Sequence, residues 1–472
     1  MDACILTNET AYYERIFNLF HNFEILEVKH LIIVVWLFFV LLHQISYLSD
    51  MKIRLHNARI LTMNEGEEIF LGEVHTDGSR ITYVGPAIGG EGFDIERDCR
   101  GNLLMPGFKN AHTHSGMSVL RSLADDLPLN DWLREAIFPV EAKMTEEDIY
   151  HMSQLSALEY LTSGITACFD MYLTPQSVSK AMDDMGFRCC QVGCMNDFSQ
   201  DIEWLERMYL TGNQPDSLQS YIFGFHAEYT TCMDNMKAIA ALAHRYKAPV
   251  YTHACETMAE VEGCKQRYGM TPVQLLDSVG LFDYGGGIYH GIYMTEADYD
   301  VMTRRGLYVV TNPGSNTKLA SGIAPVTEYL QRGIPVAIGT DGPASNNCLD
   351  FFREMFLVAG LAKLHDNDAA TLDARQVLRM ATVNGARAMH LNDCDVLAKG
   401  KKADIIMIDL WQPNMQPINN IEKNIVYSGS KQNVKMTMIN GSILYEDNTF
   451  HCGVDPMDVY AKVEAIKQRI CR

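Results

Sequence analysis

The most constraining feature of this sequence is an alternation of short apolar runs with longer stretches of helical spacing, from about residue 106 to residue 396. The runs include ITACFDMY, YIFGFHAEY, PVYTHACE and PVAIGTD, and segments such as DNMKAIAALAHRYK lie between them. Repeated strand-then-helix units are typical of parallel sheets that are covered by helices. With the run that ends at His114 taken first, about eight strands can be counted, which is enough to close a barrel. The sequence therefore predicts an α/β fold, a (β/α)8 TIM-type barrel over residues 106–396.

The segments on both sides of this region have a different texture. Residues 51–105 and 397–450 contain short β-type runs with turn residues between them, such as ITYVG and KMTMINGSILYED. We expect the two flanks of the barrel to pair into one small β-sandwich. Residues 451–472 are predicted to form a C-terminal helix.

Residues 1–50 form an apolar N-terminal extension that does not resemble the rest of the chain. Residues 31–42 read LIIVVWLFFVLL, and looser counting extends the run to residue 48, near the length of a membrane-spanning helix. We interpret the extension as upstream sequence attached by a mis-assigned start, because Met51 opens a typical first strand, MKIRLHNARILTMN. The alternatives are a genuine membrane anchor and a signal peptide, although no small-residue cleavage site follows. We therefore expect a cytoplasmic protein, or a membrane-anchored one if residues 31–48 are an anchor.

Composition narrows the class of partner. The chain of 472 residues has a formal net charge of −20, and such a surface repels phosphate backbones. We therefore expect a small-molecule substrate and no nucleic acid, and we leave a homo-oligomer open. The 13 cysteines include no Cys-x-x-Cys pair, which favours reduced thiols in a cytosolic enzyme.

Metal-ligand residues stand at the predicted strand ends. His112 and His114 are two apart, so on a strand both side chains point to the same face. His253 ends the run PVYTH, His290 ends GGGIYH, and Asp341 ends PVAIGTD. Because all strand ends of one polarity open onto one face of a barrel, these side chains are expected to converge.

The predicted metal ligands are His112, His114, His253 and Asp341. Three imidazoles and a carboxylate suit one divalent metal ion per chain, most often zinc, with iron as the alternative. Two-metal barrels of this type often carry a carboxylated lysine on strand four, and no lysine occurs from residue 181 to residue 236. A single metal ion is therefore expected.

The chemistry expected at such a site is hydrolysis, because a metal ion lowers the pKa of water toward neutrality. Glu256 follows His253 by three residues and is predicted to carry the proton from water to the substrate. Asp341 is predicted to hold the attacking oxygen, and His290 to orient it. Attack on an aminated ring carbon would release ammonia.

These motifs resemble one known group of proteins. From about Met51 to its end the chain is similar to the amidohydrolase superfamily, within it to the 5′-methylthioadenosine/S-adenosylhomocysteine deaminases and the related triazine hydrolases. The stretches that carry this resemblance are MPGFKNAHTHSGM, LADDLPLNDWL, NPGSNTKLASGIAPV, GTDGPASNN and KGKKADIIMID.

The resemblance implies a metal-dependent aminohydrolase that deaminates an adenine nucleoside such as 5′-methylthioadenosine, S-adenosylhomocysteine or adenosine. The alternatives are an aminohydrolase of another amino-heterocycle (guanine, pterin or triazine) and a cyclic-amide hydrolase. The matching positions imply that Glu256 shuttles protons and that Trp132, Glu141 and His226 bind the substrate, with Glu141 on the ribose hydroxyls.

The chain departs from the family pattern at two points. It reads His226-Ala-Glu228-Tyr, where the family usually has proline before the tyrosine, and the extra acid is expected to change the charge of the pocket. The segment LQSYIFGFH carries no arginine, and Arg207 is the only one between residues 196 and 226. A carboxylate on the substrate tail would therefore lack the usual partner.

Overall fold

The structure is a computed structural model that describes residues 51–123, 125–127 and 131–471. The apolar run at residues 31–42, and with it the three interpretations of the N-terminal extension, lies outside the described residues. None of the helices that are described combines the length and the apolar character needed to cross a bilayer.

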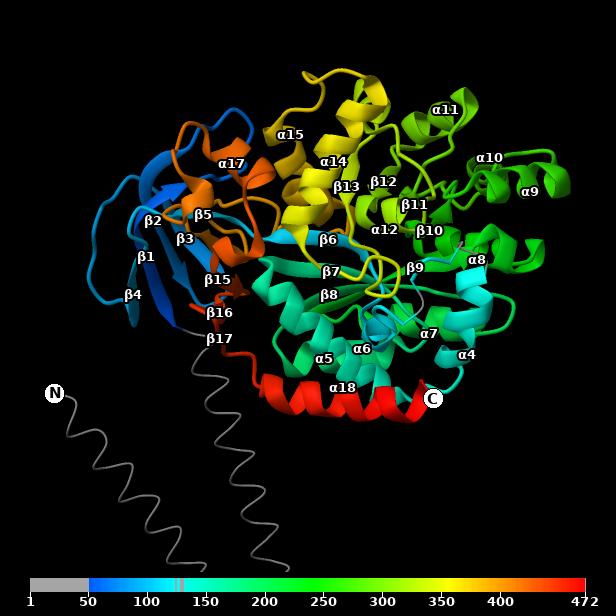
Figure 1. Ribbon diagram of the computed structural model, residues 1–472, viewed down its shortest axis with the longest axis horizontal. Coiled ribbons are helices and arrows are strands. Elements are labelled where there is room, and N and C mark those ends of the chain that lie inside the picture. The colour runs from blue at the N-terminus through cyan, green and yellow to red at the C-terminus, as the bar shows by residue number, and fades with distance from the viewer. Residues whose placement is uncertain (1–50, 124, 128–130, 472) are drawn as a thin grey trace, which may run out of the picture. The chain divides into compact units, whose positions relative to one another are not determined.

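Eight parallel strands follow one another around the centre of the domain in chain order (Figure 1). They are β6 (Phe108–Thr113), β7 (Ile165–Met171), β8 (Arg188–Val192), β9 (Gln219–Ala227), β10 (Val250–Ala254), β11 (Gly286–His290), β12 (Tyr308–Thr311) and β13 (Val336–Ile338). Every residue of β10 and β11 is buried, as expected for parallel strands that are covered on both faces. The predicted barrel is therefore confirmed.

The barrel is brought together between its first and last strands by contacts at the ends of β6 and β13. The backbone N–H of Asp341 donates to the carbonyl of His112 at 3.0 Å, and that of Thr340 donates to Asn110 Oδ1 at 2.9 Å. A Cβ atom on Gly339 would lie 2.8 Å from His112 Cβ. Glycine is needed there because the two strand ends approach so closely.

Helices cover the outside of the barrel. Their apolar residues follow the helical period: α8 buries Met236, Ile239, Ala240 and Ala243, one stripe of the helix. The helices between consecutive strands include α5 (Glu146–Thr162), α6 (Pro175–Asp184), α7 (Ile202–Gly212), α8 (Met233–Tyr246), α9 (Met258–Tyr268), α10 (Pro272–Ser278), α11 (Glu296–Arg305), α12 (Pro313–Lys318) and α13 (Val326–Gln331). After β13 follow α14 (Phe351–Asp366), α15 (Ala374–Arg379) and α16 (Gly385–Ala388).

The two flanks pair in one nine-stranded mixed sheet beside the barrel (Figure 1). Its strands run in the order β17-β16-β15-β14-β5-β1-β2-β3, with β4 on β1, so the flanks meet where β5 pairs antiparallel with β14. The bounds are β1 (Lys52–Ile60), β2 (Phe70–Asp77), β3 (Arg80–Gly85), β4 (Ile95–Asp98), β5 (Leu103–Pro106), β14 (Ile405–Ile408), β15 (Val434–Ile439), β16 (Ser442–Glu446) and β17 (Thr449–Phe450). The short helix α17 (Ile421–Tyr427) lies within the second flank, and the C-terminal helix α18 (Pro456–Ile470) packs on α5.

Candidate active site and metal centre

The four predicted metal ligands lie together at the carboxyl ends of the barrel strands. His112 Nε2 is 3.1 Å from His253 Nε2, and His114 Nε2 is 3.2 Å from Asp341 Oδ1. The distance from His112 Nε2 to Asp341 Oδ1 is 3.7 Å. Strands β6 and β10 and the loop after β13 thus bring three ring nitrogens and one carboxylate oxygen to one point.

The hydrogen bonds behind this cluster orient its imidazoles. His114 Nδ1 donates to the carbonyl of Met171 at 2.5 Å, and His253 Nδ1 donates to the carbonyl of His226 at 2.7 Å. A neutral ring that donates through Nδ1 carries a lone pair on Nε2. Backbone carbonyls in this role are typical of metal-binding histidines.

The donor set fits a divalent cation. Burial and the neighbouring imidazoles keep the pKa of His112 and of His253 well below the ordinary value of 6.5, so both rings are neutral. His253 then points its Nε2 lone pair at His112 Nε2 across 3.1 Å. In a metal-bound protein the two nitrogens can instead donate electron pairs to one cation, and three nitrogens with one oxygen are a usual zinc set.

Glu256 and His290 lie on one side of this cluster. Glu256 Oε2 is 3.8 Å from His290 Nε2, and the Ser321 hydroxyl lies 3.4 Å from Glu256 Oε1. Burial raises the pKa of Glu256, and the His290 ring opposes that rise. Asn316 Oδ1 accepts from His290 Nδ1 at 2.8 Å, so His290 turns Nε2 toward the site. A carboxylate that can take up and release protons therefore stands beside an oriented imidazole.

Three residues at the ends of these strands have left-handed backbone conformations. The φ angles are +58° at Cys255, +72° at His290 and +59° at Asp341. Residues with a Cβ rarely adopt this region, and such residues cluster at functional sites. This conformation directs the side chain of His290, the last residue of β11, and that of Asp341, in the loop after β13, across the barrel mouth.

A cavity of about 450 Å³ opens above the cluster. Eight of the nine residues predicted for the site line it, and His112 lies fully buried beside His114 and His253. The remaining lining is largely apolar: Met117, Leu133, Ile137, Phe138, Met171, Leu173, Phe198, Tyr229 and Leu319. No lysine or arginine occurs among the described residues that line it.

The three residues expected to bind substrate stand around this cavity. Trp132, 5% exposed, begins the π-helical turn Trp132–Ile137. Tyr172 donates its hydroxyl to Glu141 Oε1 at 3.0 Å, and burial raises the pKa of Glu141. His226 Nδ1 lies 3.0 Å from Thr230 Oγ1, and burial lowers the pKa of His226 to about 4.

The extra acid of the His226-Ala-Glu228-Tyr segment does not line the cavity. The Glu228 side chain is fully buried and forms an ion pair with Arg267 on α9. The expectation that it changes the pocket's charge was wrong, because the Glu228 side chain points away from the cavity and pairs with the guanidinium group of Arg267. Arg207 lies on α7 and is also not among the lining residues.

Four residues of the site did not emerge from the sequence. Ser315 and Asn316 contact Asp341 and His290, Tyr172 contacts Glu141, and Glu260 accepts hydrogen bonds from the backbone N–H groups of Cys255 and Glu256 at 2.9 and 2.8 Å. The stretch NPGSNTKLASG contains two of them, but no spacing in the sequence assigns them a partner. Their partners are known only once the barrel has closed.

Comparison with known proteins identifies a family and several relatives of this chain. The amidohydrolase family matches residues 103–444. A 5-methylthioadenosine/S-adenosylhomocysteine deaminase of Caldanaerobacter subterraneus is 36% identical over 89% of this chain and 99% of its own. A 5′-deoxyadenosine deaminase of Methanococcoides burtonii is 35% identical over 84% of this chain and 93% of its own.

A solved structure matches as well. The crystal structure of an adenosine deaminase from Xanthomonas campestris with bound zinc superposes with a TM-score of 0.84 and 32% identity, over 89% of this chain and 98% of that one. The family match covers more than half of the chain. The relatives that share more than 30% identity and the matching barrel fold indicate the same family. The chain belongs to the amidohydrolase family.

Proposed function

We propose that this protein is a metal-dependent deaminase of adenine nucleosides and that it favours nucleosides with an uncharged 5′ substituent. The observation that carries the proposal is the pairing of Glu256 and His290 beside the metal-ligand cluster, at the floor of a cavity that also contains Glu141. The names of the relatives, which include two kinds of adenine nucleoside deaminase, support the same reading.

The residues of the site divide the chemistry between them. When bound, a divalent ion supplies the Lewis acidity that makes deprotonation of water favourable near neutral pH. Glu256 takes a proton from the attacking water and delivers it to a ring nitrogen of the purine. The new C–O bond forms at the aminated carbon, and the new hydroxyl then gives its proton to the amino group. The C–N bond breaks, ammonia leaves, and an oxo-purine nucleoside remains. His290 and Asp341 hold the oxygen that attacks.

Glu141 suits the recognition of a ribose. An ionised carboxylate accepts hydrogen bonds and can bind both hydroxyls of a vicinal diol. Tyr172 holds one of its oxygens at 3.0 Å and so fixes the carboxylate in the cavity. We propose that Trp132 and His226 complete the nucleoside pocket.

The charge of the cavity supports the preference for an uncharged substituent. Glu141, Glu256 and Asp341 contribute acidic side chains, and the described lining contains no lysine or arginine. A substrate carboxylate would lose its hydration there without gaining a cationic partner, which is costly. Phe138, Phe198 and Tyr229 instead offer apolar surface for a methylthio or methyl group.

Cofactor and cell compartment follow as proposals. We propose one zinc ion per chain, held by His112, His114, His253 and Asp341, with iron as the alternative. The 12 cysteines of the described residues are all free thiols, which supports a location in a reducing compartment such as the cytoplasm.

Ammonia release tests the function. Zinc-loaded protein would be assayed with 5′-methylthioadenosine, 5′-deoxyadenosine, adenosine and S-adenosylhomocysteine, and with guanine, a pterin, a triazine and hydantoin. We expect the first two to have the highest kcat/KM. Hydrolysis of hydantoin opens its ring without releasing ammonia, so it would be followed separately by the loss of hydantoin itself, and turnover of this compound alone would identify a cyclic-amide hydrolase. A preference for S-adenosylhomocysteine would refute the role of the cavity's charge.

A further inference from the structure

We propose that Glu354, a buried carboxylate on α14, is a positioning residue that sets the geometry of His290 and Asp341 through the turn at residues 313–316. The inference rests on the proposed function for its kinetic consequences. The contacts that link Glu354 to the site are in the structure, and each step of the link is a hydrogen bond between buried groups.

The turn reaches the site through two side chains. Ser315 donates its hydroxyl to Asp341 Oδ2 at 2.6 Å, and Asn316 Oδ1 accepts from His290 Nδ1 at 2.8 Å. Ser315 is fully buried and Asn316 is 2% exposed. Consecutive residues of one short helix, α12, therefore orient the side chains that end β11 and follow β13. A small shift of the turn would displace both groups together.

Glu354 fastens this turn. Its Oε2 accepts the backbone N–H of Gly314 at 2.8 Å, and its Oε1 accepts from Asn346 Nδ2 at 2.8 Å. Asn346 Nδ2 also donates to the carbonyl of Thr340 at 2.7 Å, the residue before Asp341. One carboxylate thus joins the turn to the loop that carries Asp341. Helices α12 and α14 lie side by side in this region (Figure 1).

The close approach depends on glycine at position 314. A Cβ atom there would lie 2.4 Å from Glu354 Oε1 and 2.6 Å from both amide atoms of Asn346. Real side chains do not sustain such distances, so only glycine lets the carboxylate reach the backbone. The contact between the turn and Glu354 therefore requires both the carboxyl group at 354 and the missing side chain at 314.

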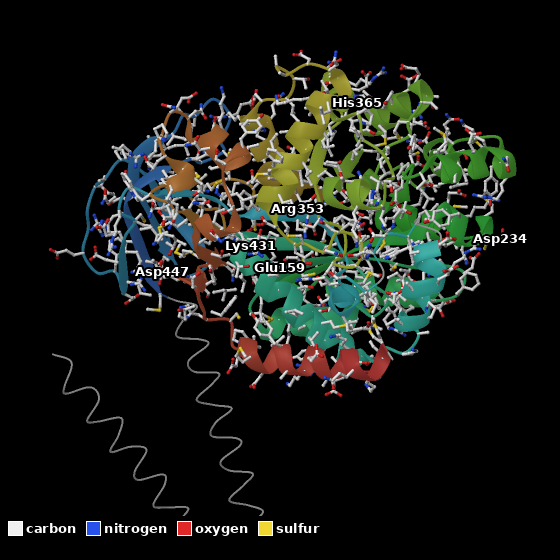
Figure 2. All side chains as sticks on the ribbon, in the orientation of Figure 1. Glu159, Asp234, Arg353, His365, Lys431 and Asp447 are labelled. Atoms are coloured by element: carbon white, nitrogen blue, oxygen red, sulfur yellow. The ribbon has the colours of Figure 1, made fainter. Side chains whose placement is uncertain are left out.

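Burial of the Glu354 side chain lowers the stability of the fold, and the formation of helix α14 does not depend on an acid at this position. Glu354 is fully buried, burial raises its pKa to about 8, and no described lysine, arginine or histidine forms an ion pair with it. The neighbouring Arg353 of α14, labelled in Figure 2, is exposed. A buried acid without a cationic partner disfavours folding. Acids in such costly positions are found most often at functional sites.

The test compares Glu354→Gln with a matched control, Glu159→Gln. Glutamine keeps the shape but turns an N–H group toward one of the two donors. Glu159, also labelled in Figure 2, is a partly buried carboxylate on α5 that accepts the backbone N–H of Leu349 at 3.1 Å, just before α14. Among the described residues its carboxylate contacts Arg121, Leu349 and Lys431, none of which belongs to the 313–316 turn.

In zinc-loaded full-length protein we expect kcat of E354Q to fall by about 10- to 100-fold, the range for residues that orient metal ligands. KM should stay within about threefold, because the turn acts on the reacting groups rather than on the nucleoside pocket. The zinc content should be unchanged, and E159Q should match the wild type in all three quantities. A wild-type kcat in E354Q would overturn the proposal.

A second comparison shows whether Glu354 acts through the turn. In a Ser315→Ala/Asn316→Ala background the turn no longer contacts Asp341 or His290, so adding E354Q should change kcat little further. A full additional loss in that background would show that Glu354 acts by another route. If E354Q does not fold, Glu354→Asp keeps the carboxyl group, shortens the reach by one methylene and is expected to lower kcat likewise.

A readout without turnover separates this inference from the proposed function. In cobalt-substituted protein the visible absorption bands report the arrangement of the metal ligands. E354Q should shift these bands, since the position of Asp341 changes, and E159Q should leave them in place. If the wild type deaminates no nucleoside and the bands still shift, the proposed function fails and the positioning role stands. Unchanged absorption bands in E354Q would refute the positioning role of Glu354.

Discussion

Ser315 donates its hydroxyl to Asp341 Oδ2 at 2.6 Å, while Asp341 Oδ1 lies 3.2 Å from His114 Nε2. The carboxylate therefore presents one oxygen to the ligand cluster and has its other oxygen held by the turn at 313–316. Because both carboxylate oxygens of Asp341 have partners, the side chain has little freedom to rotate.

Removal of the serine hydroxyl should loosen Asp341 without removing a ligand. We expect Ser315→Ala to keep its zinc and to lose about 10-fold in kcat, the low end for residues behind a metal ligand. Metal analysis and steady-state kinetics would measure this. Thr317→Ala is the control, since Thr317 lies on the same helix and bonds the carbonyl of Pro313 instead. Equal losses in both variants would contradict the role of Ser315.

Glu256 is expected to carry protons and not to bind the metal. Glu256→Gln should retain the zinc and lose about 10²- to 10⁴-fold in kcat, the usual contribution of a general acid–base group. Substitution of Glu262, an exposed residue of α9, by glutamine should have no effect. A variant with glutamine at 256 that turns over normally would show that another group moves the proton.

His253 is expected to be indispensable for metal binding, because its Nε2 lies 3.1 Å from His112 Nε2. His253→Ala should bind less than stoichiometric zinc and have no activity. Zinc should raise the Tm of the metal-free wild type, because a ligand that binds only the folded state stabilises it, and should leave the Tm of H253A unchanged. The exposed His451→Ala is the control. Full zinc occupancy of H253A would exclude His253 as a ligand.

His226 should make stability depend on pH. Its pKa is about 4 in the folded protein and about 6.5 when unfolded, so between these values the unfolded chain binds a proton that the folded chain does not. Stability is then lost as pH falls from 6.5 to 4.

The comparison of His226→Asn with the wild type isolates this contribution. In metal-free protein the wild type should lose about 1–2 kcal/mol more unfolding free energy than H226N between pH 7 and pH 4.5, an amount reduced by water in the cavity. Denaturation with urea at both pH values would measure it. Equal losses in the two proteins would mean that the folded protein accepts the proton on His226.

Two glycines near α14 should respond oppositely to alanine. Gly314→Ala places a Cβ 2.4 Å from Glu354 Oε1 and should destabilise the fold by about 1–3 kcal/mol, as overpacking does. Gly360 lies inside α14 with nothing within 4 Å of an added Cβ, so Gly360→Ala should stabilise by about 0.5–1 kcal/mol. Thermal denaturation of both would show the difference. A stable G314A would mean that the turn is looser than the structure has it.

Much of the protein could be predicted from the sequence because its signals are local. A strand repeats every two residues, so His112 and His114 had to share a face, and apolar runs that end in His253, His290 and Asp341 marked strand ends without knowledge of the fold. The rule that parallel strands of a barrel end on one face then brought these residues together.

Tertiary structure decided which groups hold these side chains in place. Ser315 meets Asp341 across 26 residues and Glu354 meets Gly314 across 40, and no local period relates such pairs. It also decided that Glu228 turns to Arg267 and away from the cavity. Backbone periodicity sets which residues share a face of one element, whereas a hydrogen bond between elements depends on how closely they pack, and that depends on the whole chain at once.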